Sequence, residues 1–138
     1  MMSAISPNYE QFQQLAQSPE KGTVVMLNLL KFKERASGPT ADSGGEAYRR
    51  YGDAAVKMIE EMGGRVLWAG RGDQILIGDP EQDWDQVVLV EYPSRQAFVE
   101  MVSRQDYQQA HKDREAGLER TIVVACTPTP NATSRRGA

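Results

Sequence analysis

The stretch TVVMLNLLKF, residues 23–32, decides the fold class because its apolar side chains occupy both faces of one strand. Side chains in a strand point alternately to opposite sides of the sheet. An antiparallel sheet with one solvated face would alternate apolar and polar residues instead. Here one face carries Val24, Met26 and Leu30, and the other carries Val25, Leu27 and Leu29. The stretch therefore predicts a sheet that is covered on both sides.

Two later stretches have the same two-sided character. They are QVVLVEY at 86–92 and ERTIVVACT at 119–127. Ahead of them, RVLWAG at 65–70 and QILIG at 74–78 predict two further strand pieces, separated by RGD. Such a pair is typical of either a hairpin or one long bulged strand.

Helical patterns separate the strands. Apolar spacings of three and four predict helices at 7–17 and 46–62, and a third beginning after Ser94, which is a suitable N-cap. Ser103 predicts a second cap, where this helix breaks and restarts before Tyr107. The order strand, helix, strand, strand, helix, strand predicts an α+β, ferredoxin-like βαββαβ domain with an antiparallel sheet and an extra N-terminal helix.

The helices of such a domain can cover only one face of the sheet. Four strands of about six residues present a face of roughly 400 Å² in projection. A bare apolar patch of that size is at the upper end for a monomer, and covering it would contribute on the order of 10 kcal/mol per protomer before association costs. The sequence therefore predicts a homodimer with the two sheets packed face to face.

Composition narrows the class of protein. A chain of 138 residues fits one domain. Its net charge of −3 argues against nucleic acid or an anionic membrane as a partner, because both are bound through basic surfaces. The start of the chain lacks the pattern of a secretory signal, and no apolar run could span a bilayer, so we expect a cytoplasmic protein. One histidine and one cysteine give no metal-site spacing, so we expect no metal and no cofactor.

Three stretches carry a family resemblance: GGRVLWAG at 63–70, VVLVEYPSRQAF at 87–98 and SRQDYQQAHKDREAGLERTIVVA at 103–125. They resemble the domain-of-unknown-function family 1330 (DUF1330), which belongs to the dimeric α/β-barrel superfamily. The most specific positions are Tyr92-Pro93, Ser103, Tyr107 and Arg114. The resemblance implies a ferredoxin-like protomer, a homodimeric α/β barrel and a cleft between sheet and helices. It implies no reaction.

These patterns divide the chain into three parts. Residues 1–21 form an N-terminal helical extension, residues 22–127 form the DUF1330-like domain, and residues 128–138 form a polar tail that we expect to be disordered. The segment 33–45 is longer than most loops in compact domains and is a candidate lid.

Polar or aromatic side chains at apolar positions are the candidates for a site. Asn28 lies mid-strand among leucines, where a buried and unpaired amide would cost roughly 1–3 kcal/mol, so it bonds either a neighbouring strand or a ligand. Tyr51 is either core packing or a phenol that reaches into a cleft. Trp68 is either core, dimer interface or ligand contact.

A helical stripe supplies the remaining candidates. Tyr107, His111, Arg114 and Leu118 lie on one side of a helix because they are separated by four, three and four residues. His111, the weak candidate for a catalytic base, would act near neutral pH. Arg114 could bind a carboxylate or enolate, or it could bond the last carbonyls of its own helix.

Two functions fit these residues, and a structural or stress-related dimer without a ligand is the third alternative. The first is a homodimer that binds a small apolar or aromatic molecule in the sheet–helix cleft, through Asn28, Tyr51, Trp68, His111 and Arg114. The second is an enzyme without cofactor, similar to the monooxygenases or isomerases of the superfamily, which rests on likeness of fold. The sequence favours neither a particular ligand nor a pathway.

Overall fold

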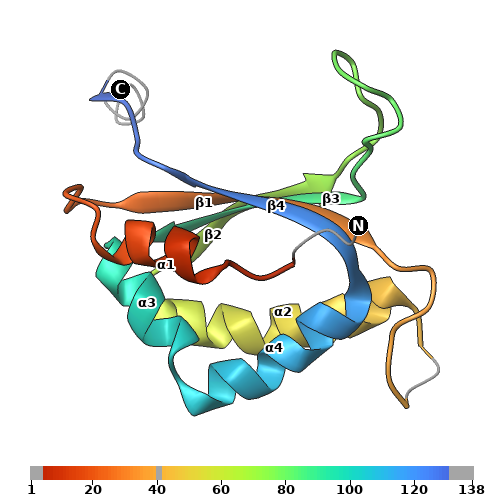
Figure 1. The fold of residues 1–138 in the computed structure, drawn as a ribbon, viewed down its shortest axis with the longest axis horizontal. Helices are drawn as coiled ribbons and strands as arrows, with labels where there is room; N and C mark the ends of the chain where they lie inside the picture. The colour runs from red at the N-terminus through yellow and green to blue at the C-terminus, as the bar shows by residue number, and fades with distance from the viewer. Residues whose placement is uncertain (1–4, 40–41, 131–138) are drawn as a thin grey trace.

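The computed structural model describes residues 5–39 and 42–130. Four helices and four strands follow one another along the chain (Figure 1). Their bounds are α1 Tyr9–Ala16, β1 Val24–Phe32, α2 Gly44–Glu61, β2 Arg65–Arg71, β3 Gln86–Tyr92, α3 Arg95–Val102, α4 Gln105–Gly117 and β4 Leu118–Cys126.

The strands form one open antiparallel sheet in the order β2-β3-β1-β4. The helices lie on one side of this sheet, as Figure 1 shows. Without α1, and with α3 and α4 taken as one broken helix, the order is βαββαβ. The predicted α+β, ferredoxin-like class is confirmed, and so is the additional N-terminal helix. The sheet of the single chain does not close into a barrel.

The core lies between the sheet and helices α2, α3 and α4. It contains alternate residues of β1 and β3 together with apolar side chains of the helices. Its buried members are Val24, Met26, Ala55, Met58, Ile59, Val90, Tyr92, Met101 and Tyr107. The face of β1 that carries Val24, Met26 and Leu30 is therefore the inner face of the sheet.

The opposite, outer face of the sheet has no helix over it (Figure 1). It carries Leu27, which pairs with Leu89 on β3 and with Val124 on β4. Leu67, Trp68, Ile122 and Val124 are exposed large hydrophobics of strands β2 and β4. The charged residues Lys31 and Arg120, and the ion pair Arg65–Glu91, lie toward the strand ends. The predicted second apolar face exists and is uncovered in the single chain.

Two local predictions were wrong. Residues 74–78 form no strand, because Leu76 and Ile77 lie exposed in the loop between β2 and β3. The helix does break before Tyr107, but Ser103 ends α3 rather than capping α4, and its hydroxyl donates to the Val99 carbonyl at 2.7 Å. Arg104 takes the cap position of α4 without a side-chain hydrogen bond.

Helices α2 and α4 approach closely at Gly44 and Gly117. A Cβ atom on Gly44 would lie 2.6 Å from the Gly117 carbonyl oxygen and 2.7 Å from the Lys33 nitrogen. Ser43 caps α2 and forms a capping box with Glu46, which fixes this end of the helix. The contact between the two helices therefore depends on the absence of a side chain.

We expect Gly44→Ala to lower the free energy of unfolding by about 2–4 kcal/mol, since backbone atoms must move apart. Gly52→Ala is the matched control in the same helix, because no atom lies within 4 Å of the position that its new methyl group would take. That control should raise the free energy of unfolding by about 0.5–1 kcal/mol. Urea denaturation of both variants measures the difference, and equal effects would contradict the close approach.

Two further predictions concern membrane spans and the C-terminal tail. Among the described residues, no helix is long and apolar enough to cross a membrane. Most of the tail expected at 128–138 falls on residues 131–138, which lie outside the described residues.

Candidate functional site

A row of aromatic rings crosses the layer between the sheet and the helices. Phe32 contacts Tyr48 at a centroid distance of 5.4 Å, and Tyr48 contacts Tyr51 at 5.3 Å. Tyr51 meets Tyr107 edge to face at 5.9 Å, and Tyr107 meets His111 at 5.8 Å. The hydroxyls of Tyr51 and Tyr107 are hydrogen-bonded at 2.9 Å. The row joins the end of β1 to α4 and places the only histidine at its end.

Burial governs the charge state of the tyrosines. Desolvation raises the pKa of Tyr48, Tyr51 and Tyr107, while the positive charge of Arg114 acts in the opposite direction. All three phenols are therefore neutral at physiological pH. They can donate or accept hydrogen bonds, but they do not supply a negative charge to the site.

His111 is partly buried beside this row, with 22% of its side chain exposed. Its Nδ1 atom lies 3.5 Å from Glu115 Oε1, and its Nε2 atom lies 3.5 Å from Ser6 Oγ. Burial lowers the pKa of His111, the Arg114 charge lowers it further, and Glu115 opposes both effects. His111 is therefore a neutral imidazole near pH 7, the form that can accept a proton.

This lowered pKa makes stability depend on pH. The unfolded chain binds a proton at His111 near the ordinary pKa of 6.5, while the folded chain binds it only at lower pH. The neutral form of His111 therefore contributes fully to the free energy of unfolding above pH 6.5. This contribution falls as the pH drops toward the folded-state pKa, by at most about 1.4 kcal/mol per pH unit. Urea denaturation at several pH values should show a steeper acid loss for wild type than for His111→Gln. Parallel curves would contradict the lowered pKa.

Arg114 is the only buried charged residue among those the structure describes, with 7% exposure. Its guanidinium donates from Nη1 to the backbone carbonyl of Ile5. Within residues 5–39 and 42–130, no carboxylate forms an ion pair with it. The sequence left open that Arg114 bonds the last carbonyls of its own helix. In the structure its hydrogen bond goes to Ile5 instead. A buried cation without an anion is unfavourable unless something else supplies the charge.

Asn28 lies on the inner face of β1, half-buried. Its Nδ2 atom donates to the carbonyls of Met26 at 3.1 Å and Val88 at 3.2 Å. The neighbouring-strand alternative therefore accounts for its donors. Its Oδ1 atom accepts no hydrogen bond from any described residue, so this acceptor remains available. Val123, opposite Asn28 on β4, is on the same face and is 44% exposed.

Trp68 does not join these residues. A register shift between Val66 and Trp68 places an additional residue in β2 and turns the Trp68 ring to the outer face of the sheet. There the ring lies beside Gly70 and is 54% exposed. The sequence also missed Ile5 and Ser6, which carry no motif. The structure thus brings together Tyr51, His111 and Arg114, places Asn28 on the facing strand, and excludes Trp68 from this cleft.

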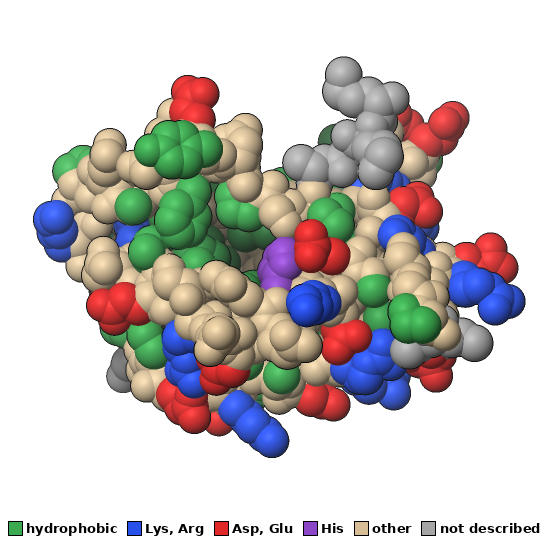
Figure 2. Space-filling model, turned by 60° about the horizontal axis from the view of Figure 1, so that its bottom comes forward, with side chains coloured by type: hydrophobic (Ala, Val, Ile, Leu, Met, Phe, Trp, Pro, Cys, Tyr) green, Lys and Arg blue, Asp and Glu red, His purple; other side chains and the backbone are tan. Residues whose placement is uncertain are grey.

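The surface is hollowed beside the histidine. Figure 2 shows hydrophobic side chains gathered around a depression, with the purple histidine at its edge. The chain has a single histidine, so this side chain is His111. We call this depression, together with His111 and the neighbouring residues Tyr51, Tyr107 and Arg114, the cleft.

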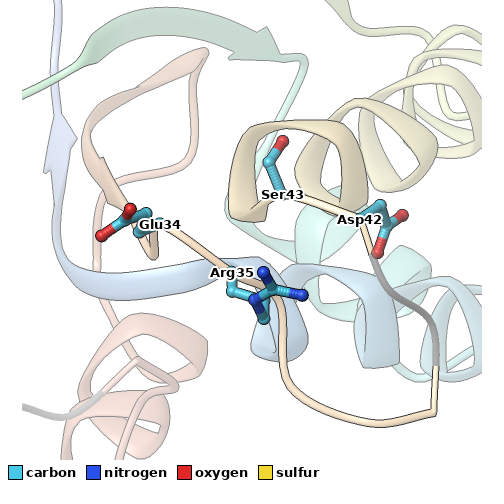
Figure 3. A pocket seen from close by; sticks show the side chains of 4 residues that line it. All are labelled: Glu34, Arg35, Asp42 and Ser43. Carbon is cyan, nitrogen blue, oxygen red and sulfur yellow. The ribbon is translucent and has the colours of Figure 1, made fainter.

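The loop after β1 borders a separate, polar pocket of about 480 Å³, lined by Glu34, Arg35, Asp42 and Ser43 (Figure 3). This loop is tied to the end of α4, since Ser37 donates to the Ala116 carbonyl and Lys33 to the Gly117 carbonyl. Arg50 pairs with both Asp42 and Asp113. The lid role expected for 33–45 remains a prediction.

A profile described as "Domain of unknown function (DUF1330)" matches residues 43–127. A crystal structure of RPA0582, a protein of unknown function from Rhodopseudomonas palustris, is 37% identical, with a TM-score of 0.88 over 93% of this chain and 98% of that chain. The chain belongs to the DUF1330 family. The family resemblance predicted from the sequence is thereby confirmed.

More distant structures are similar to this chain in fold only. At3g17210 from Arabidopsis thaliana is 15% identical, with a TM-score of 0.53 over 77% of this chain and 95% of that chain. SnoaB, a cofactor-independent oxygenase from Streptomyces nogalater, is 12% identical, with a TM-score of 0.51 over 78% of this chain and 94% of that chain. No curated protein matches the chain.

Proposed function

We propose that this DUF1330 protein is a homodimer that binds one small aromatic molecule per protomer in the cleft. The observation that carries the proposal is Arg114, a buried guanidinium with no carboxylate partner among the described residues. Structural arginines of this kind are normally paired, because an isolated buried charge costs several kcal/mol. A group that is unfavourable for folding and lies beside a cleft is typical of a binding site.

The neighbouring residues fit an aromatic ligand. The half-buried ring of Tyr51 is available for aromatic contact and is backed by the buried ring of Tyr107, and Val123 adds an exposed apolar side chain on the sheet. Asn28 Oδ1 and His111 supply acceptors near the apolar walls. A mostly apolar cleft with a few oriented polar groups is the usual composition of a small-molecule site.

The outer face of the sheet supports the homodimer. Its apolar centre, which includes Leu27, Leu89 and Val124, is bordered by charges near the strand ends, as in interfaces with an apolar core and a polar rim. A second copy is the occupant we propose because its own outer face has the same shape and chemistry. Sheet-to-sheet packing covers both patches at once.

Calorimetric titration with 2-naphthoate tests the binding proposal. We expect saturation with one ligand per protomer and a Kd on the order of 1 mM or tighter, given a ligand of this size. His111→Gln should weaken binding, whereas Val56→Thr, on the exposed side of α2, should not. Absence of any saturable heat up to about 10 mM would contradict an aromatic site.

A cofactor-independent enzyme is the second candidate, and one observation favours it. His111 is neutral near pH 7 and lies at the edge of the cleft, where it could accept a proton from an activated substrate. SnoaB shows that this fold can hold such a reaction in another protein. Turnover that follows the His111 titration and is lost in His111→Gln would support catalysis.

A further inference from the structure

The N-terminal segment occupies the polar end of the cleft. The Ile5 carbonyl oxygen accepts the hydrogen bond of Arg114 Nη1, and the Ser6 hydroxyl lies 3.5 Å from His111 Nε2. These two contacts bridge 109 and 105 positions of the chain, so they are not the result of local geometry. One short segment thus contacts both basic side chains of the cleft, His111 and Arg114.

The chemistry of these contacts indicates what they replace. A carbonyl oxygen is a neutral acceptor, and it satisfies only part of a guanidinium that has five N–H donors. A carboxylate at the same position would accept two parallel hydrogen bonds and neutralise the charge. Arg114 Nε and Nη2 form no hydrogen bond with a described residue, so the guanidinium retains the donors that a second carboxylate oxygen needs.

We propose that Arg114 anchors the carboxylate of the ligand and that the Ile5–Ser6 segment competes with the ligand for this anchor. This inference rests on the proposed function and names the class of ligand as an aromatic carboxylate. Binding of the carboxylate displaces the Ile5 carbonyl from Arg114 and the Ser6 hydroxyl from His111. The segment is a strap that closes the empty site and opens when the site is filled.

The strap is weakly held, as a displaceable segment must be. Ser6 is exposed, and its contact with His111 is at the limit of hydrogen-bond distance. Beyond it, α1 begins at Tyr9 with its own capping box between Asn8 and Gln11. The helix can therefore stay folded when residues 5–6 leave Arg114.

Two measurements on the full-length protein test the strap and the anchor. The first compares 2-naphthoate with 2-naphthalenemethanol, which has the same rings without the carboxylate. We expect the carboxylate to bind at least about 10-fold more tightly, because its charge-assisted hydrogen bonds to Arg114 are stronger than those of a neutral hydroxyl. The second follows the backbone amide of Ser6 by ¹⁵N relaxation. Its order parameter should fall from about 0.85 to below about 0.6 on saturation with 2-naphthoate.

A variant provides an independent check. Ser6→Ala removes one strap contact and should raise the affinity for 2-naphthoate about two- to five-fold, because the competing segment is held less strongly. Ser18→Ala, in the link between α1 and β1, is the matched control and should leave the affinity unchanged.

The possible failures are distinct. Equal binding of the acid and the alcohol would overturn the carboxylate anchor while leaving an aromatic site in place. An unchanged Ser6 order parameter in the saturated complex would overturn the strap. If neither compound binds, the proposed function fails, and this inference fails with it.

Discussion

Val124→Asp is expected to convert the proposed dimer into a monomer. Val124 lies on the outer face of β4, 43% exposed in one protomer, opposite Leu27 of β1. In the proposed sheet-to-sheet dimer, each new carboxylate is buried against the partner without a cation. Each such buried charge weakens the free energy of association by about 2–5 kcal/mol, and a symmetric interface contains two of them. The dimer Kd should therefore rise at least about 100-fold.

Val56→Asp is the control for this substitution. Val56 is also an exposed valine, 37% accessible, but it lies on α2 and away from the sheet. Sedimentation equilibrium at micromolar protein should give twice the chain mass of 15.4 kDa for wild type and for Val56→Asp. Val124→Asp should give one chain mass with an unchanged circular dichroism spectrum. If wild type itself sediments at one chain mass, the outer face is not a dimer interface.

Arg114→Met is expected to weaken ligand binding strongly and to stabilise the protein. Methionine retains the apolar part of the side chain but removes the buried charge, which has no carboxylate partner among the described residues. The free energy of unfolding should rise by about 1–2 kcal/mol, because the unpaired charge no longer has to be desolvated. Affinity for 2-naphthoate should fall about 10- to 100-fold or more.

The matched control is Arg50→Met, which removes an exposed guanidinium paired with Asp42 and Asp113. It should leave affinity unchanged and lower the free energy of unfolding by at most about 1 kcal/mol. Urea denaturation must be compared at equal chain concentration, because the proposed dimerisation would contribute to the free energy of unfolding. A loss of more than about 2 kcal/mol in Arg114→Met would indicate that Arg114 is a structural residue.

The sequence predicted the sheet well because burial leaves a clear pattern in strands. Two-sided apolar stretches at 23–32, 86–92 and 119–127 correspond to β1, β3 and β4. The same criterion failed at 74–78, where Leu76 and Ile77 are apolar but lie in an exposed loop. Apolar character alone does not specify a strand when no neighbouring strand pairs with it.

The position of Trp68 shows why the site could be predicted only in part. Regular alternation would place Trp68 on the same face as Val66, toward the cleft. The single-residue register shift between them turns Trp68 to the outer face of the sheet, and no residue type in RVLWAG indicates this shift. Helical spacing was more reliable, since it placed His111 and Arg114 on one side of α4. The contacts of Ile5 and Ser6 are tertiary and leave no local signal.

The central claim is that the residues around Arg114 and His111 form a ligand site. The single histidine makes this directly measurable, because the protein has one pair of imidazole proton resonances to follow by NMR. Titration with 2-naphthoate should shift both His111 resonances and saturate at one ligand per protomer. His111 resonances that stay in place while 2-naphthoate binds elsewhere on the protein would contradict the claim.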